Sequence, residues 1–147
     1  MRWFAYIFAL FGGAVISLQT GSNSQLKKSL TEPLPALIAN YLIGVFAVIA
    51  VTAARRVPLP SPQQISGAPW WSWMGGLFGA FYGLMAILLA SRLGAAALTA
   101  LVITGQLICA VILDHFGWIG FEIHPAGWGR IAGCLLMIAG LTLISVF

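Results

Sequence analysis

The sequence predicts an all-α integral membrane protein with five transmembrane helices in a single membrane domain, residues 1–147. Composition is the first reason: 61% of the 147 residues are hydrophobic and only 7% are charged, which is too little charge for a soluble domain. The second reason is the spacing of the charged residues, which leaves uncharged intervals long enough for helices of about twenty apolar residues. The third is a proline-rich stretch that divides the longest of these intervals.

Local chemistry supports the limits of these spans. The first span resembles a secretory signal peptide, but four further spans follow it, so we expect it to remain as a span. Thr31 or Glu32 can cap the second helix, whose first turn holds two prolines. Residues 55–69 carry four prolines and no amphipathic period, and are predicted to be a loop. The sequence SRLG (91–94) is so short that the helices on either side of it must be antiparallel neighbours.

The five spans are predicted at residues 3–26, 33–54, 70–91, 93–114 and 129–147, with no helix of useful length between 114 and 129.

The basic residues are nearly balanced between the two sides of the membrane. Cytoplasmic loops normally hold the excess of Lys and Arg. With five spans, one side holds Arg2, Arg55, Arg56 and Arg130, and the other holds Lys27, Lys28 and Arg92. This balance allows two interpretations. The chain inserts in both orientations, so that two opposed copies form an inverted pair, or it inserts in one orientation with its amino terminus inside.

The third span is rich in glycine, which lets helix backbones approach closely in lipid. Gly75, Gly79 and Gly83 stand at successive i+4 positions, with Gly76 beside the first of them. We predict that these four glycines form a helix-packing surface. Tyr82 lies within about 20° of the same face on a helical wheel, so its hydroxyl is expected to face that surface, where it lines a cavity or bonds a neighbouring helix.

Amide side chains recur inside three of the predicted spans. Each amide puts donors and acceptors into hydrocarbon unless a partner or trapped water satisfies them. Gln19 and Asn23 are four residues apart in the first span, Asn40 precedes Tyr41 in the second, and Gln106 lies in the fourth. We predict that these side chains face one common interior. Hydrogen bonds that only hold the helices together are the alternative interpretation.

The fourth predicted span ends in Asp114. A carboxylate at a helix C-terminus meets the unfavourable end of the helix dipole, which makes Asp114 a candidate proton carrier; a solvated boundary residue is the alternative. Together with Asp114, the residues His115, Glu122 and His124 have a spacing that fits no known metal-ligand pattern. The sequence holds no recognised pairing of nucleophile and base, and no basic tract suited to nucleic acid. We expect no enzyme activity, no metal, no cofactor and no nucleic-acid partner.

Three segments in this order resemble the YdcZ-type branch of the drug/metabolite transporter superfamily. They are LQTGSNSQL, GGLFGAFYGLMAILLASRLGAA and GQLICAVILDHFG. The resemblance covers nearly the entire chain. It implies a multi-pass protein of the bacterial inner membrane, an exporter whose five helices are half of a ten-helix inverted-repeat unit. The related small multidrug resistance proteins use a glutamate in their first helix, and the absence of any acid from this first span departs from that pattern.

The function that we expect is secondary transport of a small polar or amphipathic solute by alternating access. The expected partners are a second copy of the chain, membrane lipid and the solute. The alternatives are a passive channel or lipid-moving protein, and a structural subunit of a larger membrane complex. The residues expected to contact the solute are Gln19, Asn23, Asn40, Tyr41, Tyr82 and Gln106.

Overall fold

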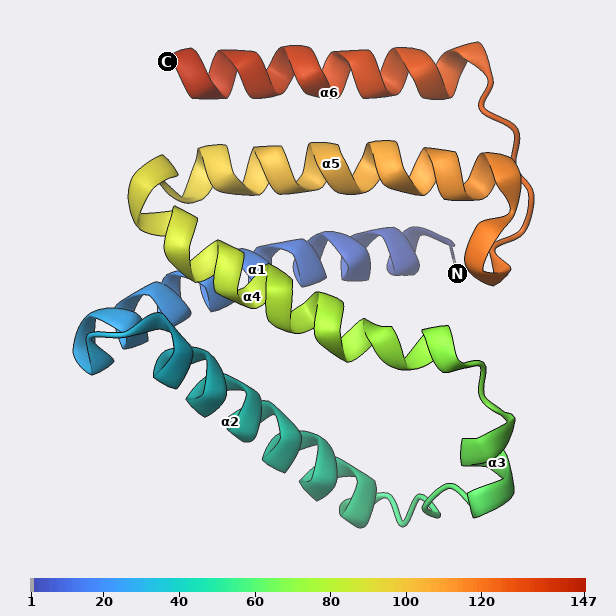
Figure 1. Ribbon diagram of the computed structural model, residues 1–147. Helices are drawn as coiled ribbons and strands as arrows, with labels where there is room; N and C mark the ends of the chain where they lie inside the picture. The colour runs from blue at the N-terminus through green and yellow to red at the C-terminus, as the bar shows by residue number, and fades with distance from the viewer. Residues whose placement is uncertain (1) are drawn as a thin grey trace. The chain divides into compact units, whose positions relative to one another are not determined.

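The protein is built of helices, without strands, over residues 2–147, the part of the chain that the computed structural model describes (Figure 1). The side chain of Arg2, one of the charges counted above, lies outside that description. The α-helices are α1 (Arg2–Leu30), α2 (Pro33–Ala54), α3 (Pro62–Gly67), α4 (Met74–Leu93), α5 (Ala95–Phe116) and α6 (Trp128–Val146), with 3-10 turns η1 (Trp70–Trp73) and η2 (Trp118–Gly120).

Five segments within residues 2–147 are long and apolar enough to cross a membrane. They are α1, α2, η1 together with α4, α5 and α6. The predicted fold class, an all-α integral membrane protein with five transmembrane helices, is therefore confirmed. The chain divides into two compact units, an N-terminal unit (Met1–Ser91) and a C-terminal unit (Arg92–Phe147), which are described separately below.

In the N-terminal unit, α1 and α2 pack against each other as a helical hairpin. Only Thr31 and Glu32 separate the two helices. Glu32 takes the N-cap position in an extended conformation, but its side chain makes no capping hydrogen bond. Thr31 adopts a φ of 64°, a left-handed conformation that is unfavourable for a β-branched residue. The sharp reversal between the helices therefore depends on backbone geometry and on the proline that starts α2.

Helix α1 runs four residues further than the predicted limit of 26, to Leu30, and includes Lys27 and Lys28 in its last turn. The prediction ended the span at the first charge. No glycine or proline lies between residue 26 and Thr31, and a lysine near the end of a membrane helix can extend its long side chain to the interface without ending the helix. Charge marks the edge of the hydrocarbon, whereas the backbone turn marks the end of the helix.

The proline-rich linker after α2 contains a short helix that the sequence analysis did not predict. Ser61 accepts a hydrogen bond from Gln64 N, and the Gln64 side chain accepts one from the Ser61 backbone. This reciprocal arrangement is a capping box. Pro62 occupies the first helical position, where a missing N–H costs little. The four prolines suggested a loop throughout, but one of them starts α3.

In the C-terminal unit, α5 and α6 pack side by side and run in opposite directions (Figure 1). Glycines with positive φ stand at both ends of α5: Gly94 with φ 77° and Gly117 with φ 63°. A Cβ added at Gly117 would lie 2.7 Å from Ile123 Cγ1, so the connecting segment folds tightly back on the end of α5. Apart from the three-residue turn η2, this connection contains no helix.

Many large apolar side chains are exposed to the surroundings of the chain, and the few buried residues include polar ones. Trp3, Phe4 and Leu10 are each at least 75% exposed, whereas Asn23 is 8% exposed and Thr104 is 5% exposed. Large apolar side chains on the outside suit a protein whose solvent is lipid. Polar residues are placed inside because an amide or hydroxyl in hydrocarbon is costly without a partner.

Candidate functional site

The predicted solute-contacting residues divide between the two units. Gln106 lies on α5 in the C-terminal unit, where its side chain is exposed. The other five lie in the N-terminal unit. They are Gln19 and Asn23 on α1, Asn40 and Tyr41 on α2, and Tyr82 on α4. The geometry of the candidate site is therefore built from the N-terminal unit.

Asn23 and Asn40 stand at the same depth of the α1–α2 hairpin. Asn23 is seven residues before Leu30, the last residue of α1, and Asn40 is seven residues after Pro33, the first residue of α2. At 1.5 Å per residue, each lies about 10 Å from the turn. Asn23 is buried and Asn40 is half-buried. We call Asn23, Asn40 and the adjacent Tyr41 the polar level of the hairpin.

Gln19 lies one turn further along α1 than Asn23, but its side chain is exposed. The i+4 spacing correctly relates the two positions along the helix. Helical spacing does not determine how much of each side chain is covered by a neighbouring helix. Within the N-terminal unit, Asn23 is thus the more deeply covered member of the pair.

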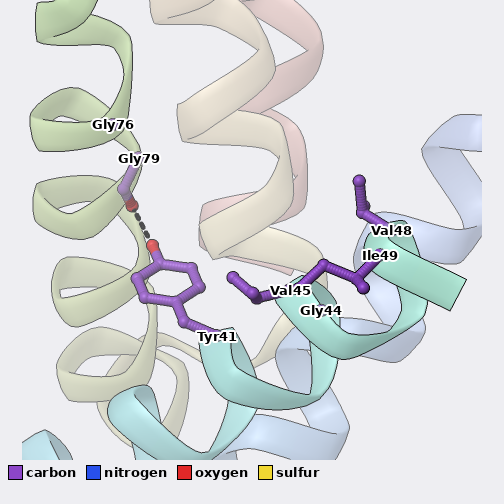
Figure 2. Close-up of a pocket in the computed structure, with 7 residues that line it drawn as sticks. All are labelled: Tyr41, Gly44, Val45, Val48, Ile49, Gly76 and Gly79. Atoms are coloured by element: carbon purple, nitrogen blue, oxygen red, sulfur yellow. Dashed lines mark hydrogen bonds between the residues drawn. The ribbon is translucent and has the colours of Figure 1, made fainter. Parts of the chain in front are cut away.

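Tyr41 connects α2 to α4. Figure 2 shows its ring reaching across from α2, with the hydroxyl donating a hydrogen bond to the backbone oxygen of Gly79. Both residues lie inside apolar spans. The backbone oxygen of Gly79 is accessible because a glycine places no side chain over the approaching helix. Tyr82, whose hydroxyl was expected to face the glycine surface of α4, is half-buried.

An apolar groove of about 630 Å³ lies between α2 and α4, beside the Tyr41 hydrogen bond (Figure 2). Three of its lining residues are glycines, whose missing side chains create much of the space. Tyr41 supplies a phenol group at a site that is otherwise almost entirely apolar. The lining residues are Tyr41, Gly44, Val45, Val48, Ile49, Gly76 and Gly79.

The glycines of α4 have different surroundings. A Cβ at Gly83 would lie 2.7 Å from Leu37 Cδ1 and 2.8 Å from the Tyr41 hydroxyl oxygen. At Gly79 the same addition would meet Tyr41 at 3.9 Å, and at Gly75 and Gly76 it would meet nothing within 4 Å. Gly83 is therefore the position on α4 at which the Leu37 and Tyr41 side chains of α2 leave no room for a Cβ, and Gly76 instead borders the groove.

In the C-terminal unit, Asp114 forms an ion pair that the sequence analysis did not predict. Arg130 Nη1 lies 3.2 Å from Asp114 Oδ2 and also donates to the backbone oxygen of His124 at 3.0 Å. The two side chains are 30% and 39% exposed, Asp114 being the more covered. One signal was available: an acid at the end of one helix and a base at the start of the next must come close when the two helices pack antiparallel.

The two histidines of this connection take part in local hydrogen bonds. His115 Nδ1 accepts a bond from Ala126 N at 3.0 Å, and His124 N donates to the backbone oxygen of Asp114 at 2.8 Å. Within residues 2–147, no three His, Cys, Asp or Glu side chains come together as a metal site. The polar groups near Asp114 therefore fold the connection onto the end of α5.

Thr104 is a buried polar residue that the sequence analysis did not single out. Its hydroxyl donates a bond of 2.7 Å to the backbone oxygen of Ala100, one turn earlier on α5. A threonine can satisfy its hydroxyl in this way inside its own helix, so it tolerates burial in an apolar span. Gln106, two residues later, is exposed.

Comparison with known proteins gives the class of the chain. A family model described as "Putative inner membrane exporter, YdcZ" matches residues 4–143. The chain is similar to the inner membrane protein YdcZ of Escherichia coli (strain K12), with 25% identity over 138 residues that cover 94% of this chain and 92% of that protein. No solved structure matches the chain. With its five apolar helices, this multi-pass inner membrane protein belongs to the YdcZ family of exporters.

Proposed function

We propose that the chain exports a small polar or amphipathic solute as a secondary transporter, by alternating access, in a homodimer of opposed copies. The family supplies the general class, an inner membrane exporter. The observation that carries the finer proposal is the polar level: Asn23, Asn40 and Tyr41 at one depth of a hairpin whose helices are otherwise strongly apolar.

The polar level would replace water around the polar part of the solute. A polar group that leaves water without new hydrogen bonds loses several kcal/mol, roughly 2–7 depending on the reference state. Asn23 and Asn40 each offer an acceptor oxygen and two N–H donors. The apolar groove between α2 and α4 begins at Tyr41. An amphipathic solute would thus place its polar group at the polar level and its apolar part along the groove.

Alternating access requires helices that can shift without losing their packing. Gly83 leaves room for the Leu37 and Tyr41 side chains of α2, whereas the space around Gly75 and Gly76 is open. The hydrogen bond from Tyr41 to Gly79 uses a backbone oxygen that a solute with an N–H or O–H group could compete for. In this mechanism, solute binding releases Tyr41 and lets α4 shift along α2. Three further residues stay predicted solute contacts, and their variants can be tested by the same transport assay. They are Tyr82, Gln19 and Gln106.

The opposed dimer rests on two features of the chain. An odd number of spans places the termini on opposite sides, and the basic residues are nearly balanced between those sides. Two copies in opposite orientations would then complete an inverted pair that either copy alone lacks.

Cysteine labelling of spheroplasts tests the orientation. Single cysteines replace Ser29 at the end of α1 or Leu59 in the linker after α2, in a chain whose Cys109 and Cys134 are changed to alanine. Both positions are exposed and uncharged, so the charge balance is preserved. We expect a membrane-impermeant maleimide to label about half of each variant before lysis. Complete labelling of one variant and none of the other would exclude opposed copies.

Transport is tested after a ligand is found. Purified protein is screened for a rise in thermal stability with a set of small polar and amphipathic compounds, since a ligand that binds only the folded state stabilises it. A stabilising compound is then followed by counterflow in proteoliposomes. We expect replacement of Asn23 and Asn40 by leucine to abolish counterflow, and Ile43→Leu on the exposed face of α2 to leave it unchanged. Unchanged counterflow in the double variant would remove the polar level from the mechanism.

We assign proton coupling of export to Asp114, whose carboxylate pairs with Arg130 at the ends of α5 and α6. Counterflow does not require net proton movement, so Asp114→Asn should retain counterflow and lose accumulation driven by a pH gradient. Saturable counterflow also separates a carrier from the alternative of a passive channel, and purification as a working dimer argues against a structural subunit.

A further inference from the structure

A second groove lies in the C-terminal unit, between α5 and α6. It has a volume of about 440 Å³ and ends at the Asp114–Arg130 ion pair. Most of its lining is apolar or small, and most of the lining residues are only half-buried, so the groove opens to the surroundings of the helix pair. The lining residues are Leu107, Ala110, Val111, Asp114, Arg130, Gly133 and Met137.

The ion pair leaves binding groups unused on both partners. Arg130 uses only Nη1 for its two bonds, to Asp114 Oδ2 and to the backbone oxygen of His124. A guanidinium group carries five N–H donors, so those on Nε and Nη2 stay available. Asp114 likewise keeps Oδ1 free of the ion pair. The end of the groove therefore presents an anion-binding and a cation-binding group side by side.

The ends of two membrane spans place this pair at the level of lipid headgroups. Asp114 is two residues before the end of α5, and Arg130 is the third residue of α6. Trp118 and Trp128, in the connection and at the start of α6, are 55% and 88% exposed. Tryptophans of membrane proteins are enriched at the membrane–water interface. An apolar groove that starts at this level and continues between the helices has the form of a site for a lipid chain.

We propose that this groove binds one zwitterionic phospholipid with a primary ammonium group. The lipid phosphate accepts hydrogen bonds from the free N–H groups of Arg130, the ammonium group donates to Asp114 Oδ1, and an acyl chain lies along the groove beside Gly133. Basic groups between membrane helices are a general means of binding lipid phosphates. The adjacent carboxylate disfavours lipids with a net negative charge, and a quaternary ammonium group has no N–H to donate to Asp114.

Apart from Asp114, this site uses residues that the proposed export mechanism does not use. It lies within one unit and uses residues other than the polar level, Asn23, Asn40 and Tyr41. Asp114 serves both proposals, but lipid binding is measured without any transport. Loss of one proposal therefore leaves the other standing.

Native mass spectrometry of the purified full-length protein tests lipid selectivity. The probes are phosphatidylethanolamine, phosphatidylcholine and phosphatidylglycerol with identical acyl chains. We expect phosphatidylethanolamine to bind at least about fivefold more tightly than either of the others, as one partly exposed charge-assisted hydrogen bond would give. Asp114→Asn should abolish this preference, whereas Glu122→Gln, which removes a neighbouring exposed acid, should keep it. Equal binding of the three lipids by the unmodified protein would overturn the proposal.

Filling the groove tests the place of the acyl chain. A Cβ at Gly133 or at Gly140, one heptad later on α6, meets nothing within 4 Å in the chain, but only Gly133 lines the groove. Gly133→Leu should weaken phosphatidylethanolamine binding roughly tenfold by displacing about two methylene groups, and Gly140→Leu should not. Ala110→Leu fills the groove from α5 and should act like Gly133→Leu, which guards against misfolding of one variant. Unaltered binding by either folded filling variant would show that the groove does not hold the lipid.

Discussion

Among the described residues, two contacts between helices involve polar side chains, and they differ in charge and in position along the spans. In the N-terminal unit, the neutral hydroxyl of Tyr41 bonds the backbone of Gly79 inside two apolar spans. In the C-terminal unit, the ions Asp114 and Arg130 meet at the ends of their helices. An ion inside hydrocarbon costs far more than a neutral group, whereas at a span end it can keep part of its hydration. The type of contact therefore follows the depth at which it lies.

The two contacts also differ in how much of the surrounding structure supports them. Arg130 bonds the connecting segment as well as Asp114, through the backbone oxygen of His124. Tyr41 has one bond, and its side chain fits against α4 because Gly83 has no Cβ. The contact in the N-terminal unit should therefore be the more sensitive to packing, and the contact in the C-terminal unit the more sensitive to salt.

The largest effect is expected from Gly83→Ala. The added methyl group would lie 2.7 Å from Leu37 Cδ1 and 2.8 Å from the Tyr41 oxygen. Because Leu37 is itself buried, we expect the free energy of unfolding to fall by about 1–3 kcal/mol. It is measured by titration with sodium dodecyl sulfate in mixed micelles. Gly76→Ala is the matched control on the same helix, where the methyl group meets nothing within 4 Å. Equal destabilisation by both variants would contradict a special role for Gly83.

A smaller effect is expected from Tyr41→Phe, which removes the hydroxyl and keeps the ring. Loss of one hydrogen bond should lower the free energy of unfolding by about 1 kcal/mol. The loss should be the same at low and high salt, since both groups are neutral. Tyr6→Phe on the exposed face of α1 is the control and should change nothing. A loss that disappears at high salt would be inconsistent with a neutral contact.

The smallest effect is expected from Arg130→Gln. Partly exposed ion pairs contribute about 1 kcal/mol or less, and the pair here is 30–39% exposed. We expect destabilisation of roughly 0.5 kcal/mol in dilute buffer, most of it absent at 1 M salt, where charges are screened beyond about 3 Å. Arg92→Gln, at the end of α4, controls for the loss of a basic residue. A large loss that persists at 1 M salt would reverse the comparison between the two contacts.

The sequence was sufficient to predict the fold class because the signal is local. Intervals without charge, such as the one between Glu32 and Arg55, identify a membrane helix without knowledge of its neighbours. The helix ends were harder. Lys27 and Lys28 suggested that the first helix ends before them, whereas the helix ends only at Leu30. The prolines of the linker suggested a loop, so the capping box of Ser61 and Gln64 was not predicted. In each case a second local signal competed with the one that was used.

The candidate site was less predictable because it depends on partners that are distant in the sequence. Spacing placed Asn23 and Gln19 on one stripe, but only the packing of α2 against α1 separates a buried amide from an exposed one. Spacing also grouped the glycines of α4, yet Gly83 meets a neighbour and Gly76 does not. Arg130 was considered only as a charge to be counted. Its partner is sixteen residues away and becomes visible when α5 and α6 are paired.

The two-residue connection between α1 and α2 bears on how the protein enters the membrane. Because only Thr31 and Glu32 lie between α1 and α2, the two helices must cross the membrane in opposite directions as one hairpin. Lys27 and Lys28, next to this connection, then lie on whichever side of the membrane the connection occupies. Orientation is thus decided once for the pair during biogenesis, and a nascent chain that reverses its first helix reverses its second as well.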